Sequence, residues 1–74
     1  MEIVRNWHLF QDAEGRTHVQ GAVYGSTKYD NGTLISTSSC IVEQEMDYWV
    51  AKTASGSTYV LLPESMDPRF RGLI

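Results

Sequence analysis

The sequence predicts an all-β protein, a small five-stranded antiparallel barrel or strongly curved sheet that ends in a short C-terminal helical turn. Three observations lead to this class. Runs of β-branched and aromatic residues recur, glycine-containing turns separate them, and no segment keeps a helical period over three turns. A chain of 74 residues has room for one domain. We expect a single β domain over residues 1–62 and a tail over residues 63–74.

The clearest predicted element is a hairpin near the middle of the chain. Residues 48–53 and 58–62 form two runs that suit a pleated surface, and the loop between them contains Gly56. Gly56 can adopt the positive φ that such a turn usually needs. Because a lone hairpin is only marginally stable in water, we expect further strands to join it.

Three further strands are expected before the hairpin, over residues 3–10, 17–24 and 33–42. We predict that Trp7 and Leu9 lie in the core. Side chains alternate between the two faces of a strand, so this prediction places Val4 and His8 on the opposite face.

Two interruptions complete the fold prediction. Gly21 lies inside a strand, which is typical of a bulge or of a close approach between backbones. After Leu62, Pro63 and Pro68 cannot lie inside a central strand. Asp67 followed by Pro68 is a typical helix start, which predicts one helical turn that ends at Gly72.

Composition restricts the classes of function. The net charge is −3, so the positive surface typical of nucleic-acid binders is not expected. No apolar run approaches the ~20 residues of a membrane span. The first residues do not read as a signal peptide, so we expect a cytoplasmic protein. Its small core and apolar tail favour a homodimer.

We expect no disulfide, metal or cofactor. Cys40 is the only cysteine, and Cys40, His8 and His18 show none of the paired spacings of a structural zinc site. Cys40 with either histidine could form a nucleophile and base, but a free cysteine between strand residues is more often a small buried side chain. We therefore predict that the protein is not an enzyme.

Five residues form the predicted partner-binding set. Glu43, Glu45 and Asp47 alternate, so in extended chain they would project the same way and face a basic partner. The alternative is an ordinary solvated turn. Lys28 and Tyr29 complete the set, because they lie in the long irregular segment where binding residues tend to be found.

Two alternative sites remain open. Hydroxyl side chains could line a groove for a small polar ligand, or could be ordinary strand and turn residues. The predicted ligand set is Ser36, Ser38, Thr53 and Ser57. A small barrel could also stack single-stranded bases on its aromatic residues, although two lysines make a weak electrostatic track. That set is Tyr24, Lys28, Tyr29, Tyr48 and Lys52.

Two stretches carry a resemblance. Residues 30–38 read DNGTLISTS, and residues 52–61 read KTASGSTYVL. Together they resemble a pattern in small β-rich bacterial and phage-borne proteins, which contribute no catalytic residues. The resemblance implies an origin in a mobile element, and the chain is similar to anti-CRISPR proteins in build alone.

We therefore expect a non-enzymatic interaction protein that binds a protein partner, for example within a nucleoprotein complex. Its narrowest form is a phage or mobile-element inhibitor of a bacterial defence complex such as CRISPR–Cas. The alternatives are a small-barrel nucleic-acid-binding protein and a module that binds a small polar ligand.

Overall fold

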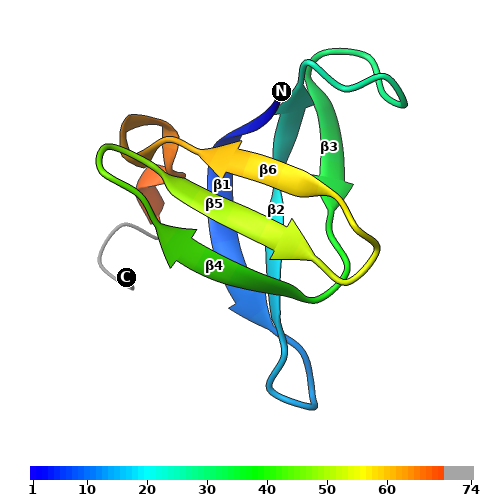
Figure 1. Cartoon of the computed structure of the whole chain (residues 1–74), viewed down its shortest axis with the longest axis vertical. Helices are drawn as coiled ribbons and strands as arrows, with labels where there is room; N and C mark the ends of the chain where they lie inside the picture. Colours follow the sequence, from blue (N-terminus) through cyan, green and yellow to red (C-terminus); the bar gives the residue numbers. More distant parts are fainter. Residues whose placement is uncertain (70–74) are drawn as a thin grey trace.

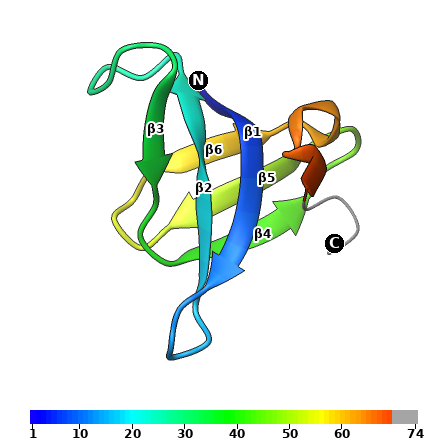
Figure 2. The ribbon, with the colours of Figure 1, turned by 180° about the vertical axis from the view of Figure 1, so that it is seen from behind.

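The strands form one six-stranded mixed sheet, in a computed structural model that describes residues 1–69 (Figure 1). The strands are β1 (Glu2–Gln11), β2 (Thr17–Tyr24), β3 (Thr33–Ser36), β4 (Cys40–Gln44), β5 (Trp49–Thr53) and β6 (Thr58–Leu61). Their order in the sheet is β3-β2-β1-β6-β5-β4. Seen from both sides, the β4–β6 half crosses the β1–β3 half at a steep angle (Figures 1 and 2). The sheet is strongly curved but does not close into a barrel.

The prediction of a β protein with a curved sheet is confirmed, but the five-stranded antiparallel barrel is wrong. Strands β1 and β6 pair in parallel, whereas the other neighbours are antiparallel. The predicted strand over residues 33–42 is two strands. Thr37 stays beside β2, where its N–H donates to the Val19 carbonyl and its Oγ1 accepts the Val19 N–H. Cys40 already pairs with Thr53 on β5, so residues 37–39 cross between the halves.

The central hairpin is confirmed as β5 and β6, with Gly56 in its turn at φ 94°. The first two strands also lie where the sequence predicts them. Their internal alternation differs, however, because Asn6 adopts φ 53° and the β1–β2 register shifts between Arg5 and His8. This bulge rotates the strand, so that Val4 and Trp7 are both fully buried.

Gly21 is required by this bulge. A Cβ added to Gly21 would lie 2.6 Å from Val4 Cγ1 and 2.8 Å from the Arg5 carbonyl oxygen. Both distances are far below a van der Waals contact, so the backbones of β1 and β2 can approach only at a glycine. The predicted close approach is therefore confirmed.

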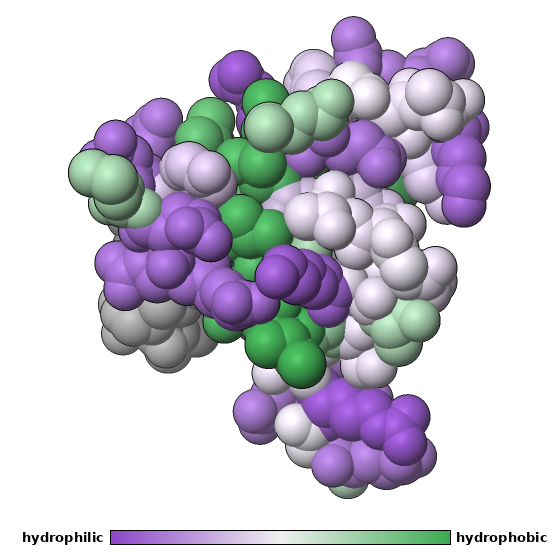
Figure 3. Space-filling view, viewed as in Figure 1, coloured by the Kyte–Doolittle hydropathy of each residue, from purple (hydrophilic) through white to green (hydrophobic). Residues whose placement is uncertain are grey.

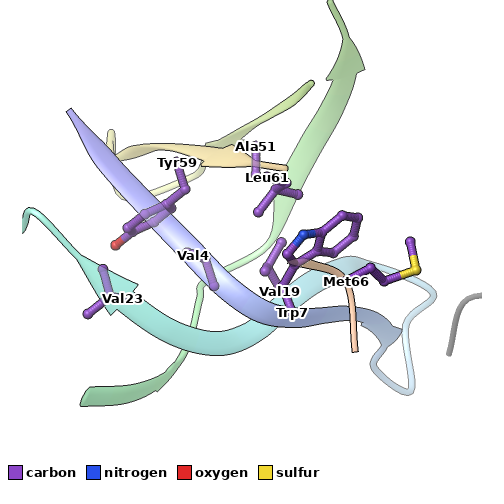
Figure 4. Close-up of a cluster of buried hydrophobic side chains, with 8 residues drawn as sticks. All are labelled: Val4, Trp7, Val19, Val23, Ala51, Tyr59, Leu61 and Met66. Carbon is purple, nitrogen blue, oxygen red and sulfur yellow. The ribbon is translucent and has the colours of Figure 1, made fainter. Parts of the chain in front are cut away.

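The core fills the space between the two halves of the sheet. Figure 4 shows its buried side chains, which are Val4, Trp7, Val19, Val23, Ala51, Tyr59, Leu61 and Met66. The predicted core residue Trp7 packs edge-on against Trp49 at 5.4 Å between ring centroids and donates its indole N–H to the Leu62 carbonyl at 2.9 Å. Leu9, also predicted in the core, packs against the cluster while partly exposed.

The segment after the sheet packs against it. A 3₁₀ turn, η1 (Pro63–Ser65), leads into Met66, which is part of the core. Asp67 caps the next residues as predicted, because its Oδ1 accepts the Arg69 backbone N–H at 3.0 Å. The rest of the predicted helical turn and tail, including Phe70, lies outside the described residues. Within residues 1–69 no helix has the length and apolarity that crossing a membrane requires.

Candidate functional site

Four predicted ligand residues and two predicted partner residues line a single cleft. Lys28 and Tyr29 reach it from the loop after β2, and the hydroxyl residues come from the end of β3, residues 37–39 and the β5–β6 hairpin. The volume of this hydroxyl cleft is ≈ 110 Å³. Its lining consists of Lys28, Tyr29, Ile35, Ser36, Thr37, Ser38, Thr53, Ser55, Ser57 and Tyr59.

A hydrogen-bond network fixes one wall of the hydroxyl cleft. Thr53 is buried, and its Oγ1 accepts the Ser57 N–H at 3.0 Å and lies 3.1 Å from Ser55 Oγ. Ser38 Oγ donates to Ser55 Oγ and accepts the Ser55 N–H, both at 3.3 Å. Ala54 N–H donates to the Ser39 carbonyl at 2.8 Å. The β5–β6 turn is therefore tied to residues 37–39, and these hydroxyls serve the wall itself.

Other donor groups on the hydroxyl cleft have no hydrogen-bond partner among the described residues. In the part of the chain that the structure describes, no hydrogen bond or ion pair engages the hydroxyls of Ser36, Ser57 and Tyr59 or the Lys28 ammonium. Ser36 and Lys28 are exposed at the rim, whereas Tyr59 is 7% exposed. The cleft thus combines a fixed wall with unengaged donors.

His18 contacts Thr37, one of the residues that line the hydroxyl cleft. Its Nδ1 lies 2.9 Å from the Thr37 carbonyl oxygen, and its Nε2 lies 2.8 Å from Asp12 Oδ2. Both partners are acceptors, so both contacts are satisfied only when the ring carries two protons. The Asp12 hydrogen bond, followed by the Thr37 carbonyl, raises the pKa of His18. The same bond from His18 lowers the pKa of Asp12.

The predicted acidic strip lies elsewhere, at the β4–β5 hairpin. The extended chain ends at Gln44, and the Glu45 N–H donates to the Tyr48 carbonyl, so Asp47 lies in a turn. The strict alternation of the three carboxylates is therefore lost after Glu43. Glu43 forms an ion pair with Lys52 at 3.0 Å, and this pair raises the pKa of Lys52. Glu45 and Asp47 are exposed and form no ion pair within residues 1–69.

Strand β4 presents an open edge beside this hairpin. Within residues 1–69 it is the last strand of the order and pairs with β5 alone. Ile41 points outward from it and is 71% exposed. A shallow groove of ≈ 480 Å³ lies along the start of β4 and reaches Thr17 on β2. Figure 3 shows a hydrophobic band across the β4–β6 face, bordered by hydrophilic side chains.

The residues of the nucleic-acid alternative do not gather on one surface. Lys28 and Tyr29 line the hydroxyl cleft, whereas Tyr48 lies in the β4–β5 turn. Lys52 is paired with Glu43, and the Tyr24 ring lies under the Arg5 guanidinium at 5.5 Å. A continuous base-stacking track would need these rings and cations side by side.

Cys40 borders the β4 groove. Burial raises the pKa of its thiol, and a hydrogen bond with the Thr37 side chain opposes that shift. A raised pKa keeps the thiol protonated at neutral pH and makes it a poor nucleophile. Residues 1–69 contain no group of three or more His, Cys, Asp or Glu side chains placed to hold a metal ion.

Comparison with protein-family models, curated proteins and solved structures finds no match for this chain. Function must therefore be argued from the geometry. Two elements of that geometry escape sequence reasoning, the His18–Asp12 pair and the Tyr59 hydroxyl on the cleft. The pair could have been suspected from the two facing strands of the first hairpin, but the position of Thr37 depends on the break between β3 and β4.

Proposed function

We propose that this protein is a non-enzymatic interaction module that binds an extended segment of a protein partner along β4. The observation that carries the proposal is the open β4 edge, with Ile41 71% exposed beside a groove of ≈ 480 Å³. An edge strand offers unpaired backbone donors and acceptors, and an incoming strand can continue its ladder. Side chains on the groove then add specificity.

Charge favours a basic partner. Arg16 and Lys52 border the groove, but Glu14 and Glu43 pair with them at 2.8 and 3.0 Å. The unpaired charges near β4 are therefore the carboxylates of the β4–β5 turn. A partner that carries lysine or arginine beside its extended segment would meet them and associate faster at low salt.

The opposite edge of the sheet supplies a matched control. Strand β3 is also an edge, and its Leu34 is 69% exposed. Leu34 lies on the far end of the strand order from Ile41, and it borders neither the groove nor the acidic turn. Ile41→Glu and Leu34→Glu therefore place the same charge at equally exposed aliphatic positions, and only one of them lies on the proposed interface.

The experiment is a pull-down with tagged protein from a bacterial lysate, with and without nuclease, read by mass spectrometry. We expect a stoichiometric protein partner that survives nuclease, is lost with Ile41→Glu and is kept with Leu34→Glu. Partners that disappear with nuclease would favour nucleic-acid binding instead. Equal retention by both variants would remove β4 from the interface.

The narrowest form of the proposal is an inhibitor of a bacterial defence complex, in line with the resemblance of the two sequence stretches. It adds one requirement. The partner must be a component of such a complex, and the wild-type chain must lower the activity of that complex more than Ile41→Glu does. An unrelated partner would refute this form and leave the interaction module standing.

A further inference from the structure

Tyr59 is a mostly buried residue whose hydroxyl reaches solvent and has no hydrogen-bond partner among the described residues. Tyr59 is 7% exposed, and its ring belongs to the core, while Figure 4 shows its hydroxyl end directed away from Leu61, Trp7 and Met66. Tyr59 also lines the hydroxyl cleft. No fully buried side-chain oxygen of the described residues lacks a hydrogen bond, so this hydroxyl must open into the cleft.

The groups around the Tyr59 hydroxyl favour one sign of charge in a ligand of the hydroxyl cleft. Among the described residues that line the cleft, Lys28 is the only charged one, and no carboxylate lines it. The Ser36 and Ser57 hydroxyls face the same space without a hydrogen bond in residues 1–69. The hydroxyls can donate to an anion, and the Lys28 ammonium, with no carboxylate in the described lining, favours an anion over a cation.

The volume of the hydroxyl cleft limits the part of a ligand that the cleft can enclose. Pockets for drug-sized ligands measure about 300–1,000 Å³, whereas the hydroxyl cleft measures ≈ 110 Å³. A water molecule takes about 30 Å³ of the liquid, so the cleft holds a group of a few heavy atoms. The cleft can therefore enclose a single oxyanion group, and the rest of a larger ligand would lie outside it.

The arrangement of donors favours a tetrahedral anion. They come from three separate segments, the loop after β2, the end of β3 and the β5–β6 hairpin. Among the described residues of the lining there is no arginine, whose planar fork matches a carboxylate, and Lys28 acts as a point charge. We propose that the hydroxyl cleft binds a phosphate-sized tetrahedral oxyanion, with Tyr59, Ser36 and Ser57 as hydrogen-bond donors and Lys28 as the counter-charge.

This site is distinct from the proposed interface, since no residue of β4 lines the hydroxyl cleft, and Thr53 is the one described residue that borders both the cleft and the β4 groove. The Thr53–Ser55–Ser38 network holds its wall in place before the anion arrives. A preformed site loses little conformational entropy on binding. The interface can therefore fail its test while the oxyanion site passes, and the reverse also holds.

The test is a titration of the full chain with inorganic phosphate at constant ionic strength, followed by NMR of the backbone amides. We expect saturable shifts at residues around the cleft. Tyr59→Phe removes one oxygen and keeps the buried ring, and it should weaken phosphate binding about tenfold or more, because a hydrogen bond to a charged group is lost. Tyr48→Phe, in the β4–β5 turn, should leave the affinity unchanged.

A second pair of variants keeps the test decisive if Tyr59→Phe disturbs the fold. Ser36→Ala changes an exposed side chain on the cleft and should weaken phosphate binding several-fold. Ser39→Ala, at a residue that borders the β4 groove, should not. Lys28→Gln should weaken binding by about two- to fivefold, since the ammonium is exposed, while Lys52→Gln should have no effect.

A further ligand, glycerol phosphate, tests whether the bound anion is a free ion or part of a larger molecule. Glycerol phosphate that binds as tightly as phosphate would indicate a phosphomonoester head group, and weaker binding would indicate the free ion. The absence of saturable phosphate binding at millimolar concentration would overturn the proposal. Equal affinity of the wild type, Tyr59→Phe and Ser36→Ala would also overturn it, as would acetate that binds as tightly as phosphate.

Discussion

The hydroxyl cleft and the β4 edge both carry polar groups, but these groups are held in opposite ways. In the cleft, Thr53, Ser55 and Ser38 bond to one another and form a fixed wall around a few unengaged donors. At β4, the backbone edge is open, and the exposed Glu45 and Asp47 have no ion-pair partner in residues 1–69. A fixed wall suits a small ligand, whereas an open edge suits a macromolecule that brings its own strand.

The break between β3 and β4 produces both surfaces. Residues 37–39 leave β2 after the bonds between Thr37 and Val19, and they reach β5 at the bond between Ala54 and Ser39. This crossing brings the hydroxyl residues against the β5–β6 turn. It also leaves β4 at the end of the sheet, with one edge open. One short segment therefore determines where each surface lies.

The largest expected effect is on the scaffold that the two surfaces share. Gly21→Ala places a Cβ 2.6 Å from Val4 Cγ1 and 2.8 Å from the Arg5 carbonyl oxygen. We expect the free energy of unfolding to fall by about 1–3 kcal/mol or more, because backbone has to move. Urea denaturation measures this loss, with Gln20→Ala as the neighbouring control. An unchanged unfolding midpoint would show that β1 and β2 do not approach as described.

The next largest effect is expected at the wall of the hydroxyl cleft. Thr53→Val removes the hydroxyl that accepts the Ser57 N–H, and it should lower the free energy of unfolding by about 1–2 kcal/mol. Thr58→Val, an exposed position on β6, should change it by less than about 0.5 kcal/mol. Phosphate binding should weaken with the first variant alone. Equal unfolding free energies for the two variants would mean that the network does not hold the cleft wall.

A smaller effect depends on pH. The His18 pKa is raised from 6.5 in the folded protein, so its stabilisation is complete below pH 6.5 and is lost as pH rises through the raised pKa. The Asp12 pKa is lowered from 3.8, so its stabilisation is present above pH 3.8 and is lost as pH falls through the lowered pKa. The nearby charge of Arg16 opposes the rise in the pKa of His18. The Phe10 ring stacks on the His18 ring at 5.1 Å between ring centroids.

The measurement is the free energy of unfolding of the wild type and His18→Gln across this range. The wild type should lose stability relative to the variant on the alkaline side, and Asp12→Asn should reduce that difference. Parallel curves for the wild type and His18→Gln would show that the ring does not hold both contacts. Because the pair is partly exposed, we expect a smaller change than for Thr53→Val.

The smallest effect on stability is expected at the acidic turn. Glu45→Lys with Asp47→Lys should change the free energy of unfolding by less than about 0.5 kcal/mol, since both side chains are exposed and unpaired within the described chain. The same change should slow association with a basic partner and weaken its dependence on salt. Asp30→Lys, an exposed change in the loop after β2, is the control. Partner binding that is unaffected by the double variant would remove the electrostatic part of the proposal.

Much of the fold could be predicted, because it depends on local signals. The β5–β6 hairpin follows from residue types and Gly56, and the burial of Trp7 follows from its size in a strand. The bulge at Asn6 could not be placed. Asparagine tolerates positive φ, but the same residue is common in ordinary strands and turns. The parallel pairing of β1 with β6 joins residues far apart in the chain, and no local pattern encodes it.

The candidate sites divide in the same way. Ser36, Ser38, Thr53 and Ser57 were grouped by their hydroxyl chemistry, and the structure brings them to one cleft. Lys28 and Tyr29 were grouped with the acidic residues, but they line the cleft with the hydroxyl set. The exposed Ile41 edge does not follow from the sequence, because residues 33–42 read as one strand and an edge is a property of strand order.

The measurement that tests the central claim most directly is backbone amide hydrogen exchange of the chain with and without its nuclease-resistant partner. Free amides on the open edge of β4 should exchange quickly in the isolated chain and should become protected in the complex, together with the turn over residues 45–48. The amides of the hydroxyl cleft should keep their rates. Protection that falls on residues 25–38 while β4 stays unprotected would contradict the account, as would the absence of any nuclease-resistant partner.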